Sequence, residues 1–222
     1  MTIDKKLLRI KKNLPTNVTL VAVSKTKPIE DIQVAYDAGQ RIFGENKALE
    51  LRDKEAELPK DIEWHMIGRM QTNKVKYIAQ FVHLIHSIDS ERLLSEINKQ
   101  AKKHNRVIHV LIQVHIAREV SKTGFLFAEA FEIMEKNLFD QYENVNIRGF
   151  MGMGTNTSIA AVVEEEFGKL RNLFLQCQKF KSDFDILSMG MSNDYKTAVK
   201  CGSNMVRLGS TIFGARDYSV VK

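Results

Sequence analysis

Short apolar runs recur along the whole 222-residue chain and alternate with amphipathic stretches, and this alternation constrains the fold more than any other feature. Each run has the length of a buried strand. The eight runs span residues 18–25, 41–46, 62–68, 83–89, 107–116, 146–154, 185–191 and 205–214. Near-continuous apolar strands are typical of a parallel sheet that is covered by helices.

The stretches between the runs carry helix signals. Pro28 stands at the start of one stretch and Gly39 at its end, as is usual at helix boundaries. Ser90 is a preferred N-cap residue at the start of another. The stretches with apolar residues at helical spacing are 28–38, 90–103, 125–138 and 159–180.

Eight strands, about seven helices between them and one helix in front predict a closed (β/α)8 TIM barrel with an extra N-terminal helix. We expect Leu7, Leu8 and Ile10 of that first helix to pack inward. A doubly wound open sheet is the alternative, because periodicity does not show whether the sheet closes. Since no linker or internal repeat interrupts the pattern, residues 1–222 are expected to form a single domain.

Composition narrows the class of protein further. The sequence has no 18-residue apolar run, and its charged N-terminus lacks the apolar region of a signal peptide, so we expect no membrane partner. Cys177 and Cys201 lie far apart and form no metal-binding spacing, which favours a reduced, cytoplasmic location. The net charge of +6 is spread over scattered lysines and predicts no nucleic-acid surface. We also expect a monomer.

The first run ends in a lysine, at the position where barrels carry functional groups. Strand alternation puts Val21, Val23 and Lys25 on one face, so Lys25 emerges at the barrel mouth if the valines face the interior. Desolvation there lowers the pKa of the amine, and a neutral amine forms a Schiff base with an aldehyde. The alternative is a lysine that extends to the rim or pairs with Glu45.

The loops after strands seven and eight, SMGMSND (188–194) and RLGSTIFG (207–214), have the composition of a phosphate site. Gly190 and Gly209 let backbone N–H groups approach an anion. Hydroxyl groups are supplied by Ser188, Ser192, Ser210 and Thr211. The alternative is that the glycines only turn the chain and that Ser192 caps the next helix.

Arg207 lies two residues before Gly209 and shares its inward face in a regular strand. A buried arginine needs an acceptor, which is either a carboxylate from a neighbouring strand or the ring nitrogen of a cofactor. A Schiff-base lysine, phosphate loops and an arginine for a ring nitrogen are together the set that pyridoxal 5′-phosphate (PLP) requires.

Longer motifs point to a known family. They are AVSKTKP (22–28), FGEN (43–46), WHMIGRMQTNK (64–74), HSIDS (86–90), LIQVHIAREVSKTG (111–124), IRGFMGMGT (147–155), LSMGMSNDY (187–195) and VRLGSTIFGARDY (206–218). On these motifs the chain resembles the YggS/PROSC family of pyridoxal phosphate homeostasis proteins over essentially its full length. The resemblance implies a fold similar to the N-terminal barrel domain of bacterial alanine racemase.

The resemblance also implies roles for individual residues. Lys25 would carry PLP as an internal aldimine. Arg207 would face the pyridine nitrogen, remain protonated and so weaken the ring as an electron sink. Residues implied to hold the phosphate are Ser188, Met189, Gly209 and Ser210. Residues implied to line the ring are Asn46, Ser87 and Met151. No catalytic residue and no metal ligand is implied.

The family is understood as carriers or regulators of intracellular PLP without an established reaction, with PLP-dependent apo-enzymes as candidate partners. Racemases use a second, β-rich domain with a tyrosine base, and this chain ends just after the eighth strand. One alternative is a small racemase or lyase whose base is His65, His86, His115 or Tyr195. The others are a cofactor-free Schiff-base aldolase acting on a sugar phosphate, and an interaction protein in which PLP is a structural or sensing ligand.

A few residues depart from the family pattern or stand beside the expected site. Lys47 follows FGEN, and His115 replaces an asparagine in the motif of the fifth strand. Lys122 follows the fifth strand as a second amine near the mouth, or as an ordinary exposed lysine. The motif GRMQTNK (68–74) is expected to begin the third helix, and Arg69, Lys74 and Lys76 near the mouth either attract phosphate or only solvate the helix end.

Overall fold

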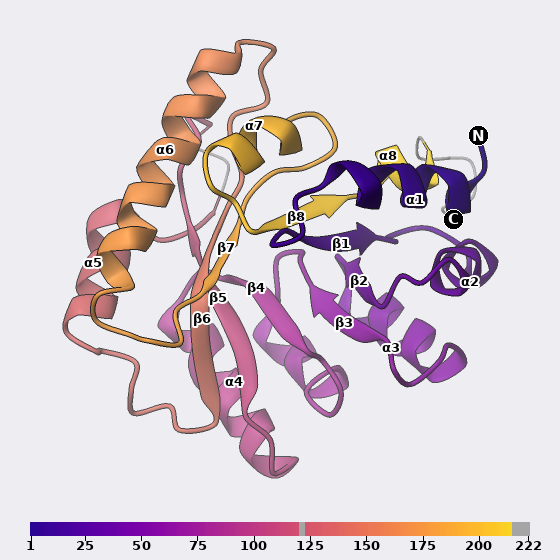
Figure 1. The fold of residues 1–222 in the computed structure, drawn as a ribbon. Coiled ribbons are helices and arrows are strands. Elements are labelled where there is room, and N and C mark those ends of the chain that lie inside the picture. Colours follow the sequence, from indigo (N-terminus) through magenta and orange to yellow (C-terminus); the bar gives the residue numbers. More distant parts are fainter. Residues whose placement is uncertain (120–122, 215–222) are drawn as a thin grey trace.

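The strands close into a parallel barrel in which each strand pairs with the next and β8 pairs with β1 (Figure 1). The computed structural model describes residues 1–119 and 123–214 of the chain. The closed barrel that the alternating pattern predicted is confirmed, and the open-sheet alternative is excluded. Lys122 lies outside the described residues, and so do the last residues of the motif at 206–218.

Every strand is shorter than the apolar run that predicted it. Seven strands lie entirely within their runs, and β6 starts one residue before the run at 146–154. They are β1 (Thr19–Val23), β2 (Ile42–Glu45), β3 (Glu63–Met66), β4 (Leu84–Ile88), β5 (Ile108–Val114), β6 (Val145–Gly152), β7 (Ile186–Ser188) and β8 (Met205–Leu208). The runs extend past the strands because apolar residues continue into the loops at the barrel ends.

The helices follow the strands and surround the barrel, as Figure 1 shows. They are α1 (Ile3–Asn13), α2 (Ile29–Asp37), α3 (Ala48–Glu57), the 3-10 helix η1 (Thr72–Tyr77), α4 (Glu91–Lys103), α5 (Phe127–Glu135), α6 (Ala160–Cys177), α7 (Tyr195–Lys200) and α8 (Ser210–Phe213). The N-terminal helix α1 packs against α2 and α8. The predicted first helix and the four helical stretches are therefore confirmed.

Two separate sets of buried side chains hold the barrel together. The larger set fills the space between the strands and the helices, and includes Trp64, Phe150 and Phe174. The smaller set lies inside the barrel and comprises the buried residues Val21, Leu84, Leu111, Met151 and Met205. Burial on both faces explains why the strand sequences are nearly continuous apolar runs instead of alternating ones.

The prediction that Leu8 packs inward is wrong. Leu8 is 55% exposed, whereas Leu7 and Ile10 of the same helix are buried. Residues three apart share a helix face, but neighbouring residues point about 100° away from each other. Leu7 and Ile10 therefore take the inward face of α1, and Leu8 is turned toward solvent.

The apolar run at 205–214 is not one strand. The strand β8 ends at Leu208, and the backbone N–H groups of Ile212 and Phe213 donate to the carbonyl of Gly209, which closes the short helix α8. The helix expected from residue 68 is also different, because η1 begins only at Thr72 and has the tighter 3-10 geometry. In both places the residue types are compatible with the predicted structure and with the observed one, so the backbone hydrogen bonds determine which of the two forms.

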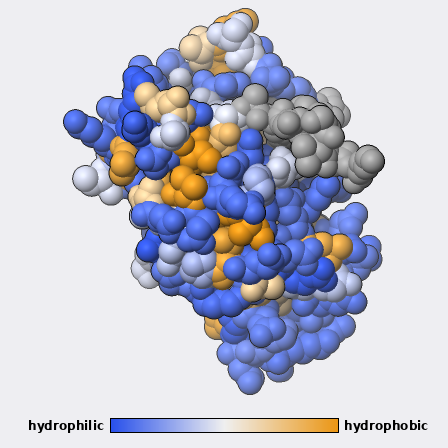
Figure 2. Space-filling model, turned by 90° about the vertical axis from the view of Figure 1, so that its right-hand side faces the viewer, coloured by the Kyte–Doolittle hydropathy of each residue, from blue (hydrophilic) through white to orange (hydrophobic). Residues whose placement is uncertain are grey.

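Figure 2 shows one face of the molecule on which a narrow band of hydrophobic residues is surrounded by hydrophilic ones. Most of this face therefore meets water through polar side chains. Among the described residues, no helix has the length and hydropathy that a membrane span requires.

Candidate functional site

A cavity of about 560 Å³ opens where the carboxyl ends of the strands meet. Residues on or directly after β1, β2, β3, β5, β6, β7 and β8 line it. Of the residues that the sequence singled out, the cavity lining contains Lys25, Asn46, Arg69, Ser192, Arg207, Gly209 and Ser210. Positions up to 185 residues apart in the chain are brought together here because parallel strands deliver their carboxyl ends to one mouth.

Lys25 lies two residues beyond the end of β1, half-buried in the cavity wall. Val21 belongs to the interior set and Val23 lines the cavity, so the three residues share the inward face as strand alternation predicts. Glu45, which was weighed as a partner for Lys25, accepts hydrogen bonds at Oε1 from Ser24 and Lys54 and does not line the cavity. Lys25 itself is part of the cavity lining.

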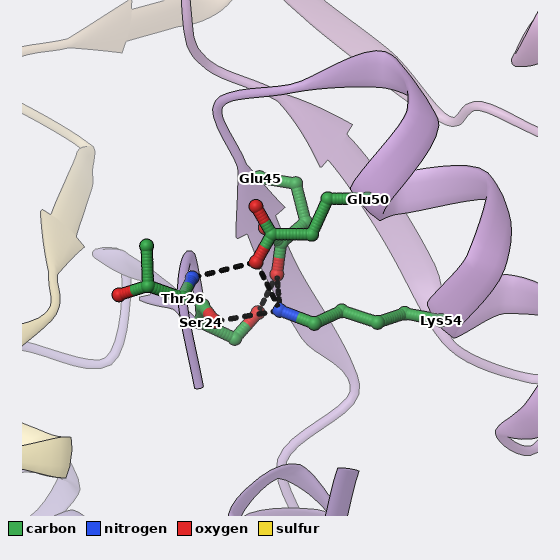
Figure 3. A network of polar contacts seen from close by, with 5 residues as sticks. All are labelled: Ser24, Thr26, Glu45, Glu50 and Lys54. Carbon is green, nitrogen blue, oxygen red and sulfur yellow. Dashed lines mark hydrogen bonds and ion pairs between the residues drawn. The ribbon is translucent and has the colours of Figure 1, made fainter. Parts of the chain in front are cut away.

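The backbone on the N-terminal side of Lys25 is tied to α3 by a buried polar network (Figure 3). Ser24 Oγ donates to Glu45 Oε1 over 2.6 Å. Lys54 Nζ donates to the carbonyl oxygen of Ser24 and to Glu45 Oε1, both over 2.8 Å. Burial raises the pKa of Glu45 to about 7, and the neighbouring Lys54 ammonium offsets part of that rise.

The backbone on the other side of Lys25 is held by the same helix. Glu50 Oε1 accepts a hydrogen bond from the backbone N–H of Thr26 over 2.6 Å and from Lys54 Nζ over 2.8 Å (Figure 3). Thr26 has a φ of 63°, a left-handed conformation that β-branched residues rarely adopt. Since both neighbours of Lys25 are anchored, the lysine leaves the barrel in one direction.

Arg207 is buried in β8 and reaches the floor of the cavity. Its Nη1 donates to the carbonyl oxygen and the hydroxyl of Ser188, and its Nη2 donates to the carbonyl oxygen of Gly152 over 3.0 Å. Burial lowers the pKa of Arg207 to about 10, with the Asp194 carboxylate acting in the opposite direction. The guanidinium therefore remains charged at neutral pH, and backbone and hydroxyl oxygens fix its orientation.

The loops after β7 and β8 meet beside Lys25. Ser192 Oγ accepts hydrogen bonds from the backbone N–H groups of Gly209 and Thr211, over 3.3 and 3.4 Å. Asp194, not Ser192, stands at the N-cap position of α7. A Cβ on Gly209 would lie 3.3 Å from the carbonyl oxygen of Val23, so glycine lets this loop lie close against β1.

Four further residues of the sequence-based set lie outside the cavity lining. Ser87 is buried and donates to the carbonyl oxygen of Gly68 over 2.6 Å. Met151 belongs to the interior set below the cavity, and Ser188 contacts Arg207 there. The N–H of Met189 donates to the carbonyl oxygen of Met205, and its side chain packs toward the helices.

The cavity also contains residues to which the sequence reading gave no role at the site. Gln113, at the end of β5, donates to the carbonyl oxygen of Thr123, and both residues line the cavity. Met153 follows β6 and lines the cavity one alternation beyond Met151. Lys27 donates to the carbonyl oxygen of Phe213 over 3.2 Å. Strand alternation beyond Met151 would have found Met153, whereas loop contacts such as that of Lys27 carry no sequence signal.

Behind Arg207 a line of polar side chains continues down the barrel. His86 Nδ1 lies 3.1 Å from Ser188 Oγ, and His86 Nε2 lies 3.0 Å from His65 Nδ1. Burial lowers the pKa of His86 well below its usual range and that of His65 to about 3, so both imidazoles are neutral near pH 7.

Comparison with known proteins identifies the family. The model of the alanine racemase N-terminal domain family matches residues 2–217. The pyridoxal phosphate homeostasis protein of Vibrio alginolyticus is 41% identical over 210 residues, which cover 92% of this chain and 89% of that protein. The chain belongs to this family of pyridoxal phosphate homeostasis proteins. The Escherichia coli K12 member is 38% identical, with 92% and 88% of the two chains covered.

Solved structures agree with the family and the fold. PipY of Synechococcus elongatus, solved with PLP bound, has a TM-score of 0.86 and 32% identity, and the match covers 96% of this chain and all of PipY. An alanine racemase of Clostridium difficile has a TM-score of 0.77 at 14% identity, over 97% of this chain and 56% of that one. The second likeness shows the fold alone, and it confirms the expected racemase-like barrel.

Proposed function

We propose that this protein binds PLP in the cavity at the barrel mouth and serves to hold and release it within the cell. One observation carries the proposal: the Lys25 amine, the Arg207 guanidinium and the turn at Gly209 and Ser210 converge on a single cavity. PipY, whose structure was solved with PLP bound, supports the same use of the barrel in a relative.

The groups around the cavity fit the chemistry of PLP. Its volume of about 560 Å³ lies within the range of small-molecule pockets. The close approach of Gly209 to β1 leaves the backbone at the start of α8, with the Ser210 hydroxyl, beside Lys25 to receive a phosphate. Asn46, at the end of β2, borders the same space and is proposed to contact the ring.

Lys25 is the proposed point of attachment. Its amine would hold the cofactor covalently through the aldehyde group that PLP would supply, and this attachment would be reversible. Because Arg207 keeps its proton at neutral pH, it would hold the ring nitrogen of PLP by donating an N–H and would not protonate it. An unprotonated ring is a weak electron sink, which favours storage of the cofactor over carbanion chemistry.

The positions of the four residues weighed as bases favour a carrier over a racemase. Within the described part of the chain, His65, His86, His115 and Tyr195 are all absent from the cavity lining. His86 is fully buried, and His115 Nε2 lies 3.1 Å from the carbonyl oxygen of Glu119. A general base has to reach the proton that it removes, and these residues do not meet the cavity beside Lys25.

Transfer to an apo-enzyme tests the carrier function. The protein would be loaded with PLP, freed of excess cofactor and mixed with the apo form of a PLP-dependent enzyme, whose recovered activity is then followed. We expect the loaded protein to restore activity and the Lys25→Ala protein, treated identically, to restore none. Racemase or lyase turnover by the protein alone, clearly above that of Lys25→Ala, would establish the enzyme alternative instead.

A further inference from the structure

A second cavity, of about 280 Å³, lies at the amino-terminal end of the barrel, opposite the mouth that holds Lys25. Glu63 and His65 of β3 line it together with His83, which directly precedes β4. One ligand atom from each of these three residues lies within 4.8 Å of the other two. Alternation puts Glu63 and His65 on the same inward face of β3, so the strand itself supplies two of the three residues of the cluster.

The His65 imidazole supplies an observation that points to a ligand. The residue is 1% exposed, and its Nε2 has no hydrogen-bond partner among residues 1–119 and 123–214. A buried nitrogen without a partner costs free energy, and native structures retain few such atoms. The residue lines the second cavity, and Nε2 is the one of its two ring nitrogens that the barrel core does not engage.

The other ring nitrogen of His65 is held in the manner that metal ligands require. His65 Nδ1 lies 3.0 Å from His86 Nε2, and His86 Nδ1 lies 3.1 Å from Ser188 Oγ. Histidines that bind metals use one nitrogen for the ion and fix the ring orientation through a hydrogen bond from the other. The ring of His83 stacks on that of His65 with 5.6 Å between centroids, which brings the second imidazole alongside.

The charges around this cavity favour a cation. Arg148 and Asp185 both line it, but they neutralise each other through a salt bridge of 2.5 Å. The carboxylate of Glu63 lies beside the two imidazoles, with its Oε2 3.5 Å from His83 Nε2. The side chains of His83 and Glu63 are 48% and 45% exposed, so an ion reaches the cluster from solvent.

From this geometry we propose that Glu63, His65 and His83 form a binding site for a divalent transition-metal ion, with Zn²⁺ as the representative ion. Two imidazoles and one carboxylate are a common zinc ligand set, and water completes the coordination. The site is distinct from the proposed PLP site and does not depend on it.

Metal binding at this end would reach the cofactor end through hydrogen bonds. An ion on His65 Nε2 requires the proton of that ring to be on Nδ1, from which it donates to His86 Nε2. His86 then donates from Nδ1 to Ser188 Oγ, which also accepts a hydrogen bond from Arg207. The proposed metal site and the arginine of the mouth are thus the two ends of one chain of polar contacts.

Calorimetric titration with ZnCl2 tests the proposal on untagged protein that has been freed of metal by a chelator. The wild-type protein is expected to bind one Zn²⁺ per chain. His83→Ala and Glu63→Gln are each expected to weaken binding at least about tenfold. Both side chains are about half exposed, so both variants are expected to keep the fold, which circular dichroism verifies.

Two matched controls separate this site from other zinc ligands. His104→Ala removes an exposed histidine at the end of α4, and Cys201→Ser removes the half-buried thiol. Both controls are expected to bind Zn²⁺ as the wild type does. The proposal is overturned if the wild type shows no saturable binding, or if its binding survives in the His83→Ala, Glu63→Gln double variant.

Discussion

Lys54 Nζ lies 2.8 Å from the backbone carbonyl oxygen of Ser24, and this contact ties α3 to the segment that presents Lys25. The same ammonium lies 2.8 Å from the buried carboxylate of Glu45. Neither residue lines the mouth cavity within the described chain. The direction in which Lys25 leaves the barrel therefore depends on an ion pair that takes no part in binding.

Replacement of Lys54 by methionine is expected to lower the free energy of unfolding by about 3–5 kcal/mol, because buried Glu45 loses the ammonium that stabilises its charge and the Ser24 carbonyl oxygen loses a charged hydrogen-bond donor. Urea denaturation of the wild type and of Lys54→Met measures this difference. The same variant is expected to bind PLP more weakly, since the segment around Lys25 loses its anchor.

Lys60→Met is the matched control for that substitution. Lys60 pairs with Glu55 over 2.9 Å, but its side chain is 63% exposed. Exposed pairs contribute little, so we expect a loss below about 1 kcal/mol. Similar losses for Lys54→Met and Lys60→Met would contradict the role given to the buried network.

The raised pKa of Glu45 predicts a specific dependence of stability on pH. The carboxyl titrates near 4.5 when unfolded and near 7 in the folded protein, so between these values the folded state holds the extra proton. Its contribution to stability is complete below pH 4.5 and declines as the pH rises toward 7, by up to about 1.4 kcal/mol per pH unit.

Glu45→Gln has a neutral side chain at every pH and isolates this contribution. The free energy of unfolding of the wild type minus that of Glu45→Gln should fall between pH 4.5 and 7 and stay level on either side. Urea denaturation at a series of pH values gives the difference. A difference that rises over this interval would mean that the Lys54 ammonium outweighs the cost of burying the carboxylate.

Replacement of glycine by alanine is expected to weaken PLP binding at Gly209 and to leave it unchanged at Gly168. In Gly209→Ala the new Cβ would lie 3.3 Å from the Val23 carbonyl oxygen, a tight contact that shifts the loop away from β1 by a few tenths of an ångström. We expect PLP affinity to fall at least about tenfold, since the start of α8 loses its position beside Lys25. Fluorescence titration with PLP measures the affinity.

Gly168 stands within α6, where an added Cβ would meet no atom within 4 Å among the described residues. Gly168→Ala is therefore expected to stabilise the protein by about 0.5–1 kcal/mol and to leave PLP affinity unchanged. Should both variants bind PLP as tightly as the wild type, the loop at Gly209 would have no part in the site.

The sequence could predict the barrel because burial on both faces of each strand is visible as apolar runs, and Lys25 because alternation follows directly from its neighbours. It could not predict the network around Glu45 and Lys54, since these residues come from different elements that meet only in the folded protein. The spacing of apolar residues also could not predict that Leu7 is buried and Leu8 exposed, because this depends on how α1 is rotated about its axis against the barrel.

Strand register sets a further limit on what the sequence predicts. His65 and His86 were both interpreted as residues near strand ends, where a base could act. In the structure His65 lies toward the amino-terminal end of the barrel and His86 in its middle. Two residues that are two positions apart on a strand point to the same face of the sheet but lie at different heights along the barrel axis. Amino-acid composition does not predict this height.

The visible absorption spectrum of the protein incubated with PLP, before and after borohydride reduction, tests the central claim most directly when the modified peptide is then mapped by mass. We predict a Schiff-base absorption band that reduction abolishes, with the added mass on Lys25. A spectrum without the band, or the added mass on Lys27 in place of Lys25, would contradict the account.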